Sequence, residues 1–153
     1  MNERGFVAIP RLLELAEFRF QLRKFLRFSE IAAEAAGISV QQYQMLQVIA
    51  AVPEGQGASI SYLADRMILR HNSAVELVDR AVRAGMVRRE SDDEDLRRSI
   101  VRLMPEGEKA LEQLIPSHLH ELDVRGGEII AALKVLLESG ENDAVANVVG
   151  DTA

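Results

Sequence analysis

One stretch of this 153-residue chain, residues 61–107, constrains the fold more than any other. Its middle part repeats apolar residues at the spacing i, i+3, i+4 and i+7: Ala74, Leu77, Val78 and Ala81. This spacing gathers the side chains on one face of a helix, so the sequence predicts a helix with one buried face and a polar outer face. The predicted helix ends at Gly85, because glycine tolerates the left-handed conformation of a helix C-cap.

The segment after this helix has the pattern of a β-hairpin. Residues 86–90 and 99–104 form two short runs, and the second is rich in β-branched residues and alternates apolar with polar side chains, as half-buried strands do. Residues 58–60 could add a short third strand. A helix held by its apolar face beside a basic hairpin is the outline of a winged helix. Its exposed helix would be the element that enters the major groove of DNA.

A long helix is predicted at residues 10–36, and its apolar side chains drift around the helix axis: Leu12, Leu13, Ala16, Phe20, Leu22, Phe25 and Leu26. A drifting stripe indicates burial on more than one side, either against a partner subunit or in a deep groove of the monomer. Ser39 and Gln42 have capping-box spacing and open a second helix. Ser61 is predicted to cap a short helix that extends to about Met67.

The C-terminal third is predicted to be helical as well. Pro105 suits the first position of a helix that follows the hairpin. We expect Pro116 to bend this helix and Gly126–Gly127 to break it, so that a final amphipathic helix ends near residue 138. Residues 140–153 are small and polar, which predicts a frayed tail.

These elements predict a mainly α fold with a small β-hairpin wing. A length of 153 residues favours a single domain. We assign residues 39–104 to a winged helix-turn-helix lobe. Residues 10–36 and 105–138 are assigned to N- and C-terminal dimerisation helices.

The net charge of −6 is unusual for a protein that binds nucleic acid, so the distribution of charge matters more than its sum. Residues 60–102 hold nine basic residues, all Arg, against eight acidic ones, whereas residues 103–153 hold three against ten. A locally basic face that binds DNA is therefore compatible with an acidic chain. With no Cys, no secretory signal and no apolar run of the roughly 20 residues that span a bilayer, we expect a cytoplasmic protein without membrane contact.

Residues 61–107 resemble the MarR family of bacterial transcription regulators. The strongest likeness is at residues 95–107, which are similar to the family's wing pattern of Asp, any residue, Arg, five residues, Leu, Thr, two residues and Gly. Met104 stands where the family usually has Thr or Ser. Residues 78–81 are similar to the end of the family's recognition helix, and the predicted helices fit in number and order. The resemblance therefore covers about residues 10–138.

The resemblance implies an intertwined homodimer with two winged-helix lobes that bind a palindromic operator in double-stranded DNA. The half-sites of such an operator lie about one helical turn apart, roughly 34–36 Å. The resemblance also implies a repressor that a small molecule, often an aromatic acid, releases from DNA. The sequence does not locate a ligand cleft, and it indicates no cofactor and no metal.

The predicted recognition helix begins between Arg70 and Ser73, and its first turns carry candidates for base contacts: Arg70, His71, Asn72, Ser73 and Glu76. Arg pairs with guanine, Asn pairs with adenine, and Glu accepts from cytosine N4. Glu76 could instead form an i,i+4 ion pair with Arg80, which is itself a candidate phosphate contact. Ser61, at a helix N-terminus, could donate to a phosphate or serve only as an N-cap.

The predicted wing tip holds a second set of candidates. Arg97 is expected to enter the minor groove, because narrow A·T-rich grooves concentrate negative potential. Asp95 is expected to support the Arg97 guanidinium through a bidentate salt bridge. The alternative is a solvated turn with a surface ion pair worth under about 1 kcal/mol. Arg98 is a candidate phosphate contact.

No residues with catalytic spacing occur in the sequence, which predicts that the chain is not an enzyme. His118 and His120 are two residues apart on a helix and point about 200° apart, so they form a poor metal pair. His118 falls on the apolar stripe and is predicted to be a core histidine. The main alternative function is a winged-helix module that binds protein instead of DNA, which would explain the net charge and Glu76 more simply. A third hypothesis is a ligand-binding dimer with little DNA affinity.

Overall fold

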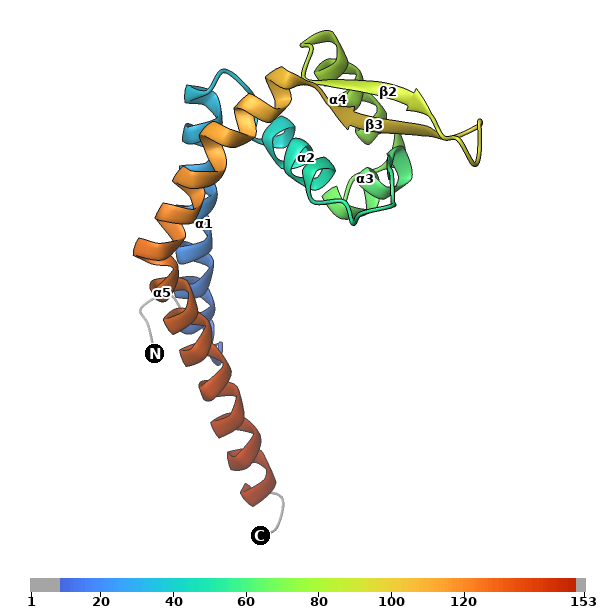
Figure 1. Cartoon of the computed structure of the whole chain (residues 1–153). Helices are drawn as coiled ribbons and strands as arrows, with labels where there is room; N and C mark the ends of the chain where they lie inside the picture. The colour runs from blue at the N-terminus through green and yellow to red at the C-terminus, as the bar shows by residue number, and fades with distance from the viewer. Residues whose placement is uncertain (1–8, 151–153) are drawn as a thin grey trace. The chain divides into compact units, whose positions relative to one another are not determined.

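The computed structural model describes the backbone of residues 9–150 and the side chains of residues 9–142. This part of the chain divides into two compact units. Residues 29–118 form the first unit, which we call the lobe. Residues 9–28 and 119–150 form the second unit, which we call the helix pair (Figure 1). The fold is mainly helical with one small antiparallel sheet, as predicted.

Three short helices form the centre of the lobe: α2 (Val40–Ala50), α3 (Ile60–Met67) and α4 (His71–Arg83). The last residues of α1 (Leu12–Ala35) and the first turns of α5 (Pro105–Gly150) belong to the same unit. The three short helices contact one another in pairs and enclose a core whose largest fully buried side chains include Met45, Leu46, Leu63, Leu77 and Val78.

Local capping determines where the first two of these helices begin. The predicted capping box of α2 is confirmed, since Ser39 Oγ accepts from the Gln42 N–H at 3.1 Å and Gln42 Oε1 accepts from the Ser39 N–H at 3.1 Å. The predicted cap of α3 was wrong by two residues. Ser59 Oγ accepts from the Tyr62 N–H at 3.1 Å, and Ser61 lies exposed inside the first turn.

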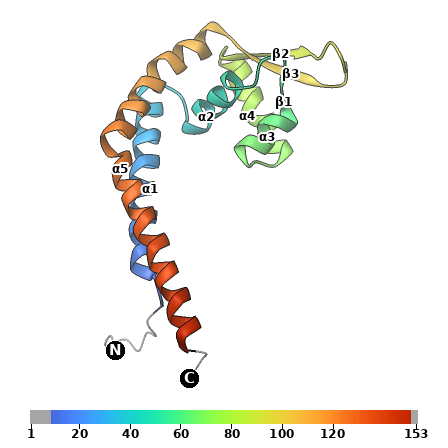
Figure 2. The same cartoon turned by 60° about the horizontal axis from the view of Figure 1, so that its bottom comes forward.

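The sheet has three antiparallel strands in the order β1-β3-β2: β1 (Ala58–Ser59), β2 (Val87–Ser91) and β3 (Ser99–Leu103). Both the predicted hairpin and the predicted third strand are present, although the latter is shorter than expected because Ile60 already begins α3. Val87 pairs with Leu103 and Ser91 with Ser99, so the hairpin is in register along its whole length. Figure 2 shows β1 on the other side of β3, next to the start of α3.

The turn from α4 into β2 requires a left-handed residue, and Gly85 supplies it with φ +72°. The Gly85 N–H donates to the Val82 carbonyl, and the Met86 N–H donates to the Ala81 carbonyl. The predicted C-terminal end of the recognition helix is thereby confirmed. Met86 and Val87, directly after the turn, are buried and lead the chain into the core.

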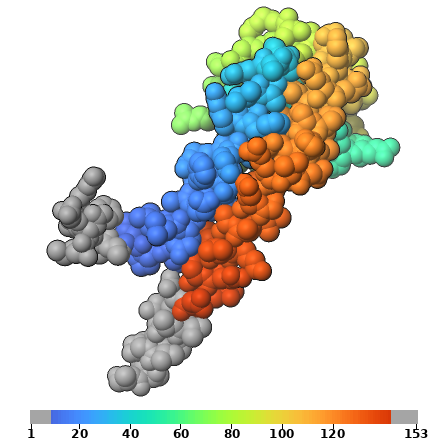
Figure 3. Space-filling model, turned by 90° about the vertical axis from the view of Figure 1, so that its left-hand side faces the viewer, coloured from blue at the N-terminus to red at the C-terminus, as the bar shows by residue number. Residues whose placement is uncertain are grey.

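In the helix pair, α1 and α5 run antiparallel and pack side by side (Figures 1 and 3). Lys24 Nζ lies 2.9 Å from Glu128 Oε2, and the Arg11 guanidinium donates to the Leu136 carbonyl. The prediction that Gly126–Gly127 breaks the last helix was wrong, because α5 is continuous from Pro105 to Gly150. Each helical glycine costs only about 1 kcal/mol relative to alanine, which the packing against α1 can offset.

The last turns of α5 fall in the segment for which the sequence predicts a frayed tail. Residues 140–150 are helical in the structure, and the fraying of these turns stays a prediction. Adding residues to an existing helix costs far less than nucleating a new one, so a small polar sequence can extend it. Residues 151–153 lie outside the described residues.

Candidate nucleic-acid interface

The outer face of α4 is the first component of the candidate site. The predicted stripe of Ala74, Leu77, Val78 and Ala81 is buried, with exposed fractions of 0–2%. The opposite face is exposed and polar: His71, Asn72, Ser73, Glu76, Arg80 and Arg83. The helix is thus held to the core by one side, while the other presents hydrogen-bonding side chains to solvent.

No described side chain caps the N-terminus of α4. Arg70 occupies the N-cap position, with extended backbone and no side-chain cap hydrogen bond. Asn72 and Ser73 lie inside the first turn, and neither is the N-cap. Both side chains are exposed and able to contact a ligand.

The exposed arginines differ in whether an acid already neutralises them. Arg70, Arg80 and Arg97 form no ion pair with any residue that the structure describes, so the alternative pairing of Glu76 with Arg80 is absent. Arg98 Nη1, in contrast, lies 4.0 Å from Asp92 Oδ2. Arg97 is therefore the wing-tip cation with the most unbalanced charge.

The wing loop, residues 92–98, is shaped by backbone hydrogen bonds rather than by the predicted salt bridge. Asp95 Oδ1 accepts from the Arg97 backbone N–H at 3.0 Å, and the Asp95 carbonyl accepts from the Arg98 N–H at 2.9 Å. The expected salt bridge from Asp95 to the Arg97 guanidinium is absent, and the Asp95 carboxylate instead accepts from the backbone of its own turn, as Asp side chains commonly do in turns. Asp95 consequently fixes the turn and leaves the Arg97 side chain exposed.

The two wing strands are joined by one carboxylate that the sequence reasoning did not single out. Arg102 Nε donates to Glu90 Oε2 at 2.9 Å, and the Arg88 guanidinium contacts the other oxygen. The hydrogen bond from Arg102, with the charges of Arg102 and Arg88, lowers the pKa of Glu90 below its ordinary value. The hairpin register could have revealed this cluster, since Arg88 pairs with Arg102 and Glu90 follows two residues later on the same face.

A second ion pair, also not foreseen, joins the wing to the helix. Arg89 Nη2 on β2 lies 2.7 Å from Asp79 Oδ1 on α4. Asp79 is half-buried at the edge of the exposed helix face. No local sequence pattern brings these two residues together, because the Gly85 turn lies between them.

His118 is a core histidine, as predicted. It is 7% exposed, its Nδ1 lies 2.8 Å from the Leu114 carbonyl oxygen and its Nε2 lies 2.8 Å from Ser29 Oγ. Its ring also lies 4.6 Å from that of Tyr43, whose pKa is raised by burial. Among the residues that the structure describes, no cluster of His, Asp and Glu could hold a metal ion.

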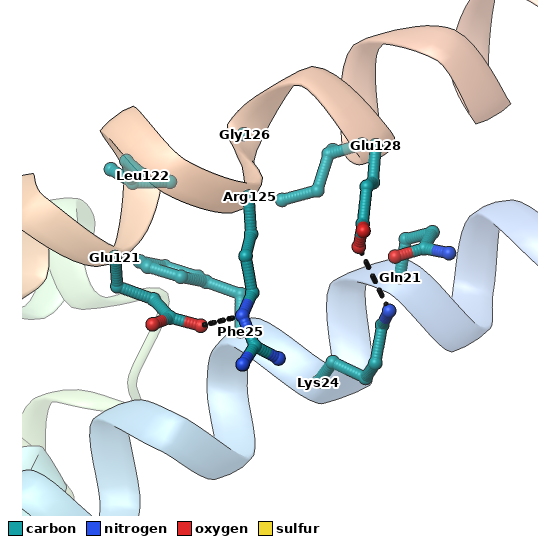
Figure 4. Close-up of a pocket in the computed structure, with 9 residues that line it drawn as sticks. Gln21, Lys24, Phe25, Glu121, Leu122, Arg125, Gly126 and Glu128 are labelled. Atoms are coloured by element: carbon teal, nitrogen blue, oxygen red, sulfur yellow. Dashed lines mark hydrogen bonds and ion pairs between the residues drawn. The ribbon is translucent and has the colours of Figure 1, made fainter.

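The helix pair contains a pocket between α1 and α5, lined among others by Phe25, Leu122 and Gly126 (Figure 4). Two ion pairs stand at its rim, Lys24 with Glu128 at 2.9 Å and Arg125 with Glu121 at 3.3 Å. Its volume of about 10 Å³ accommodates roughly one water molecule. An aromatic acid does not fit this pocket in the present conformation.

The lobe has a larger hollow of about 670 Å³ between residues 55–57 and the wing. Its lining is mainly polar and includes the carboxylates of Glu90, Asp92, Asp93 and Glu94. Arg98 and Arg102 also line it, and they pair with Asp92 and Glu90. The candidate DNA-binding surface is the outer face of α4 together with the wing tip, where the exposed polar and basic side chains lie. No described helix is both long and apolar enough to cross a membrane.

Comparison with known proteins found similarity in sequence and in fold. Residues 36–98 match the model of the MarR family. Over 138 residues the chain is 29% identical to a candidate transcriptional regulatory protein for the hcr operon of Thauera aromatica, covering 85% of this chain and 81% of the relative.

Solved structures show the same fold. AbsC, a MarR family regulator from Streptomyces coelicolor, superposes with a TM-score of 0.72 at 16% identity, covering 96% of this chain and 99% of AbsC. The regulator MOSR of M. tuberculosis, solved in complex with DNA, superposes with a TM-score of 0.56 at 21% identity, covering 86% and 93% of the two chains.

Proposed function

We propose that this chain is a DNA-binding transcriptional regulator of the MarR family that binds a palindromic operator as a homodimer. The observation that carries the proposal is the presence, in one lobe, of an exposed polar face on α4 and of Arg97 at the wing tip, which forms no ion pair with a described residue. An exposed helix suits the major groove, and an exposed arginine on a narrow hairpin suits the minor groove.

Each candidate residue has a proposed role. Arg70, His71, Asn72, Ser73 and Glu76 read base edges from the first turns of α4. Arg80 and Arg98 contact phosphates, and Arg97 enters the minor groove. Ser61 donates its hydroxyl to a phosphate, which its exposed position in the first turn of α3 permits. Asp95 acts indirectly, by holding the turn that presents Arg97.

The homodimer is supported by the apolar surface of the helix pair. Many large apolar side chains of α1 and α5 are at least 38% exposed, among them Leu12, Leu13, Leu15, Phe20, Leu26, Leu122, Ile130 and Leu133. So many exposed apolar side chains on two neighbouring helices are typical of a protein–protein interface. We propose that a second copy of the chain covers them, which would give two lobes related by two-fold symmetry.

The dimer is tested by sedimentation equilibrium. The expected mass is twice the 17.0 kDa of one chain. Leu13→Glu, at a side chain that is 81% exposed on α1, should shift the protein to monomer. Leu96→Glu, at an 80% exposed leucine on the wing, is the matched control and should stay dimeric. A wild type that sediments as a monomer would refute the dimer.

The DNA function is tested with the promoter region that flanks the protein's own gene, at several salt concentrations, for wild type and Arg97→Ala. Neutralised phosphates release counterions, so log K should fall steeply with log salt. Specific, salt-sensitive binding that weakens in the variant supports both the regulator and its wing. Binding that the variant leaves unchanged removes the proposed role of Arg97 alone.

The competing function is a winged-helix module that binds protein. The net charge of −6 favours it, as does the exposed Glu76, which forms no ion pair within the part of the chain that the structure describes. It predicts that promoter DNA binds no more tightly than a random duplex of the same length. That single result would replace the regulator with the interaction module.

We also propose that a small aromatic effector releases the protein from DNA, acting as the inducer of a cytoplasmic repressor. A thermal-shift screen with aromatic acids tests this, because a ligand that binds the folded state raises the melting temperature. A stabilising acid that also weakens operator binding supports the proposal. An acid that stabilises a protein with no DNA affinity would instead favour a ligand-binding dimer.

A further inference from the structure

The turn between α3 and α4 contains a residue in an unfavourable backbone conformation. Ile68 is the C-cap of α3, with φ 54° and ψ 46° in the left-handed region. A β-branched residue is rare there, because its side chain is crowded by its own backbone. Glycine adopts the same conformation without this penalty. The choice of isoleucine at this turn therefore needs an explanation.

Packing does not supply that explanation. Ile68 is 93% exposed, the highest value among the exposed large hydrophobic side chains of the described residues. Its two neighbours in sequence, Met67 and Leu69, are partly buried and pack against the core. The backbone conformation thus points Ile68 into solvent while the residues on either side hold the turn in place.

The residues that flank Ile68 indicate what it faces. Arg66 and Arg70 are both exposed, and neither forms an ion pair with a described residue. The exposed side chains at positions 66, 68 and 70 are therefore a cation, an apolar group and a second cation. They directly precede the first residue of α4. Two unpaired arginines favour a polyanion over an apolar protein surface.

The apolar feature that the major groove of DNA offers is the C5-methyl group of thymine. We propose that Ile68 is a specificity-determining residue that contacts a thymine methyl group in the operator, beside the base contact of Arg70, while Arg66 holds the turn against a flanking phosphate. This inference rests on the proposed function as a DNA-binding regulator. A strained and exposed apolar residue is explained if its role lies in the complex and not in the free protein.

The test uses one promoter duplex prepared in two forms, with thymine or with uracil, which lacks only the C5-methyl group. Wild type should bind the thymine form more tightly, by about four-fold for each methyl group that is buried. Ile68→Gly should bind both forms with nearly equal affinity. Ile68→Val, which keeps a branched apolar side chain, should retain most of the preference.

Stability separates this contact from a structural role of the turn. Ile68→Gly relieves the backbone strain, so its melting temperature should be equal to or above that of wild type. Ile68→Asn, a residue that tolerates the left-handed region, should also fold and lose the thymine preference. A variant that is at least as stable as wild type but less selective supports the contact.

Two results would overturn the inference, and they are distinguishable. If Ile68→Gly keeps the wild-type ratio between the thymine and uracil forms, Ile68 does not contact a methyl group, while the regulator itself stands. If wild type binds neither form more tightly than a random duplex, the proposed function fails and the contact fails with it.

Discussion

The Arg89 guanidinium lies 2.7 Å from the Asp79 carboxylate, and this ion pair ties strand β2 to helix α4. The wing and α4 are thus connected by a side-chain contact as well as by the Gly85 turn. In the proposed complex the two elements occupy different grooves, so their spacing has to match that of the DNA.

This relationship predicts that Asp79→Asn lowers operator affinity more than it lowers stability. The two side chains are 36% and 45% exposed, so the pair should contribute under about 1 kcal/mol to the free energy of unfolding. Loss of the connection should nevertheless weaken operator binding several-fold, because α4 and the wing must then be ordered on binding. Urea denaturation and DNA titration measure the two effects.

The matched control exchanges the charges. The double variant Asp79→Arg with Arg89→Asp restores the ion pair in the opposite direction and should recover part of the lost affinity. Unchanged operator affinity in Asp79→Asn would show that the Gly85 turn alone is sufficient.

The two neighbouring wing arginines should differ in their contribution to DNA binding. Arg98 lies 4.0 Å from Asp92, whereas Arg97 forms no ion pair with a described residue. Arg97→Ala should therefore cost more affinity than Arg98→Ala. A lost phosphate contact lowers the salt slope by about 1, so the slope of log K against log salt for each variant reports which arginines neutralise phosphate. An equal loss in both variants would contradict the distinction drawn from the Asp92 pair.

Elements that depend on local spacing were predictable from the sequence. The buried face of α4, the capping box at Ser39 and the hairpin from Val87 to Leu103 all follow from periodicities within a few residues. Features that depend on distant partners were not predictable. The Gly126–Gly127 pair lies in a continuous helix, and this helix packs along α1. The sequence around the two glycines does not reveal that packing.

The candidate site shows the same division. Its residue types were predictable from sequence, because the exposed positions of α4 follow from the buried ones. Their partners were not, since Asp95 is used by its own turn and Asp79 and Glu90 pair with arginines on other elements or strands. The left-handed backbone conformation of Ile68 was not predictable from the sequence either, because such a conformation is expected chiefly at glycine.

The corrected cap of α3 yields a stability prediction. Ser59→Ala removes the acceptor of the Tyr62 N–H at a buried position and should destabilise the lobe by about 1 kcal/mol. Ser61→Ala is the control, because Ser61 is exposed in the first turn and should change stability by less than about 0.5 kcal/mol. Thermal or urea unfolding of both variants measures the difference. A larger loss of stability in Ser61→Ala than in Ser59→Ala would indicate that Ser61 caps α3, as the sequence predicted.

The pKa of Glu90 leads to a pH-dependent prediction for the wing. The hydrogen bond from Arg102 lowers this pKa in the folded state from its ordinary value of 4.5. A carboxyl with a lowered folded-state pKa stabilises the protein above its ordinary pKa, and this contribution is lost as the pH falls through the folded-state value. Glu90→Gln should therefore destabilise the wing at neutral pH, and the difference from wild type should vanish in acid below that value.

Amide hydrogen exchange of β2 and β3 at several pH values measures this effect locally. Glu94→Gln, in the wing loop, is the control, because no described residue forms an ion pair with Glu94. If the exchange rates of Glu90→Gln and wild type still differ by the same factor in acid, the charge of Glu90 is not what joins the strands.

Two glycines of α5 should respond oppositely to alanine. A Cβ at Gly107 would collide with the Met86 carbonyl oxygen and approach Leu46 at 3.3 Å, whereas a Cβ at Gly127 would meet no atom within 4 Å outside its own helix. Gly107→Ala should destabilise the lobe by about 1–3 kcal/mol, because the Met86 backbone can yield only by moving the start of β2. Gly127→Ala should stabilise the helix pair by about 0.5–1 kcal/mol, since alanine lowers the entropy of the unfolded chain and favours the helix. Urea denaturation of both variants measures these changes in the free energy of unfolding. A loss of stability in Gly127→Ala would contradict the prediction and would indicate that a second copy of the chain packs against this position.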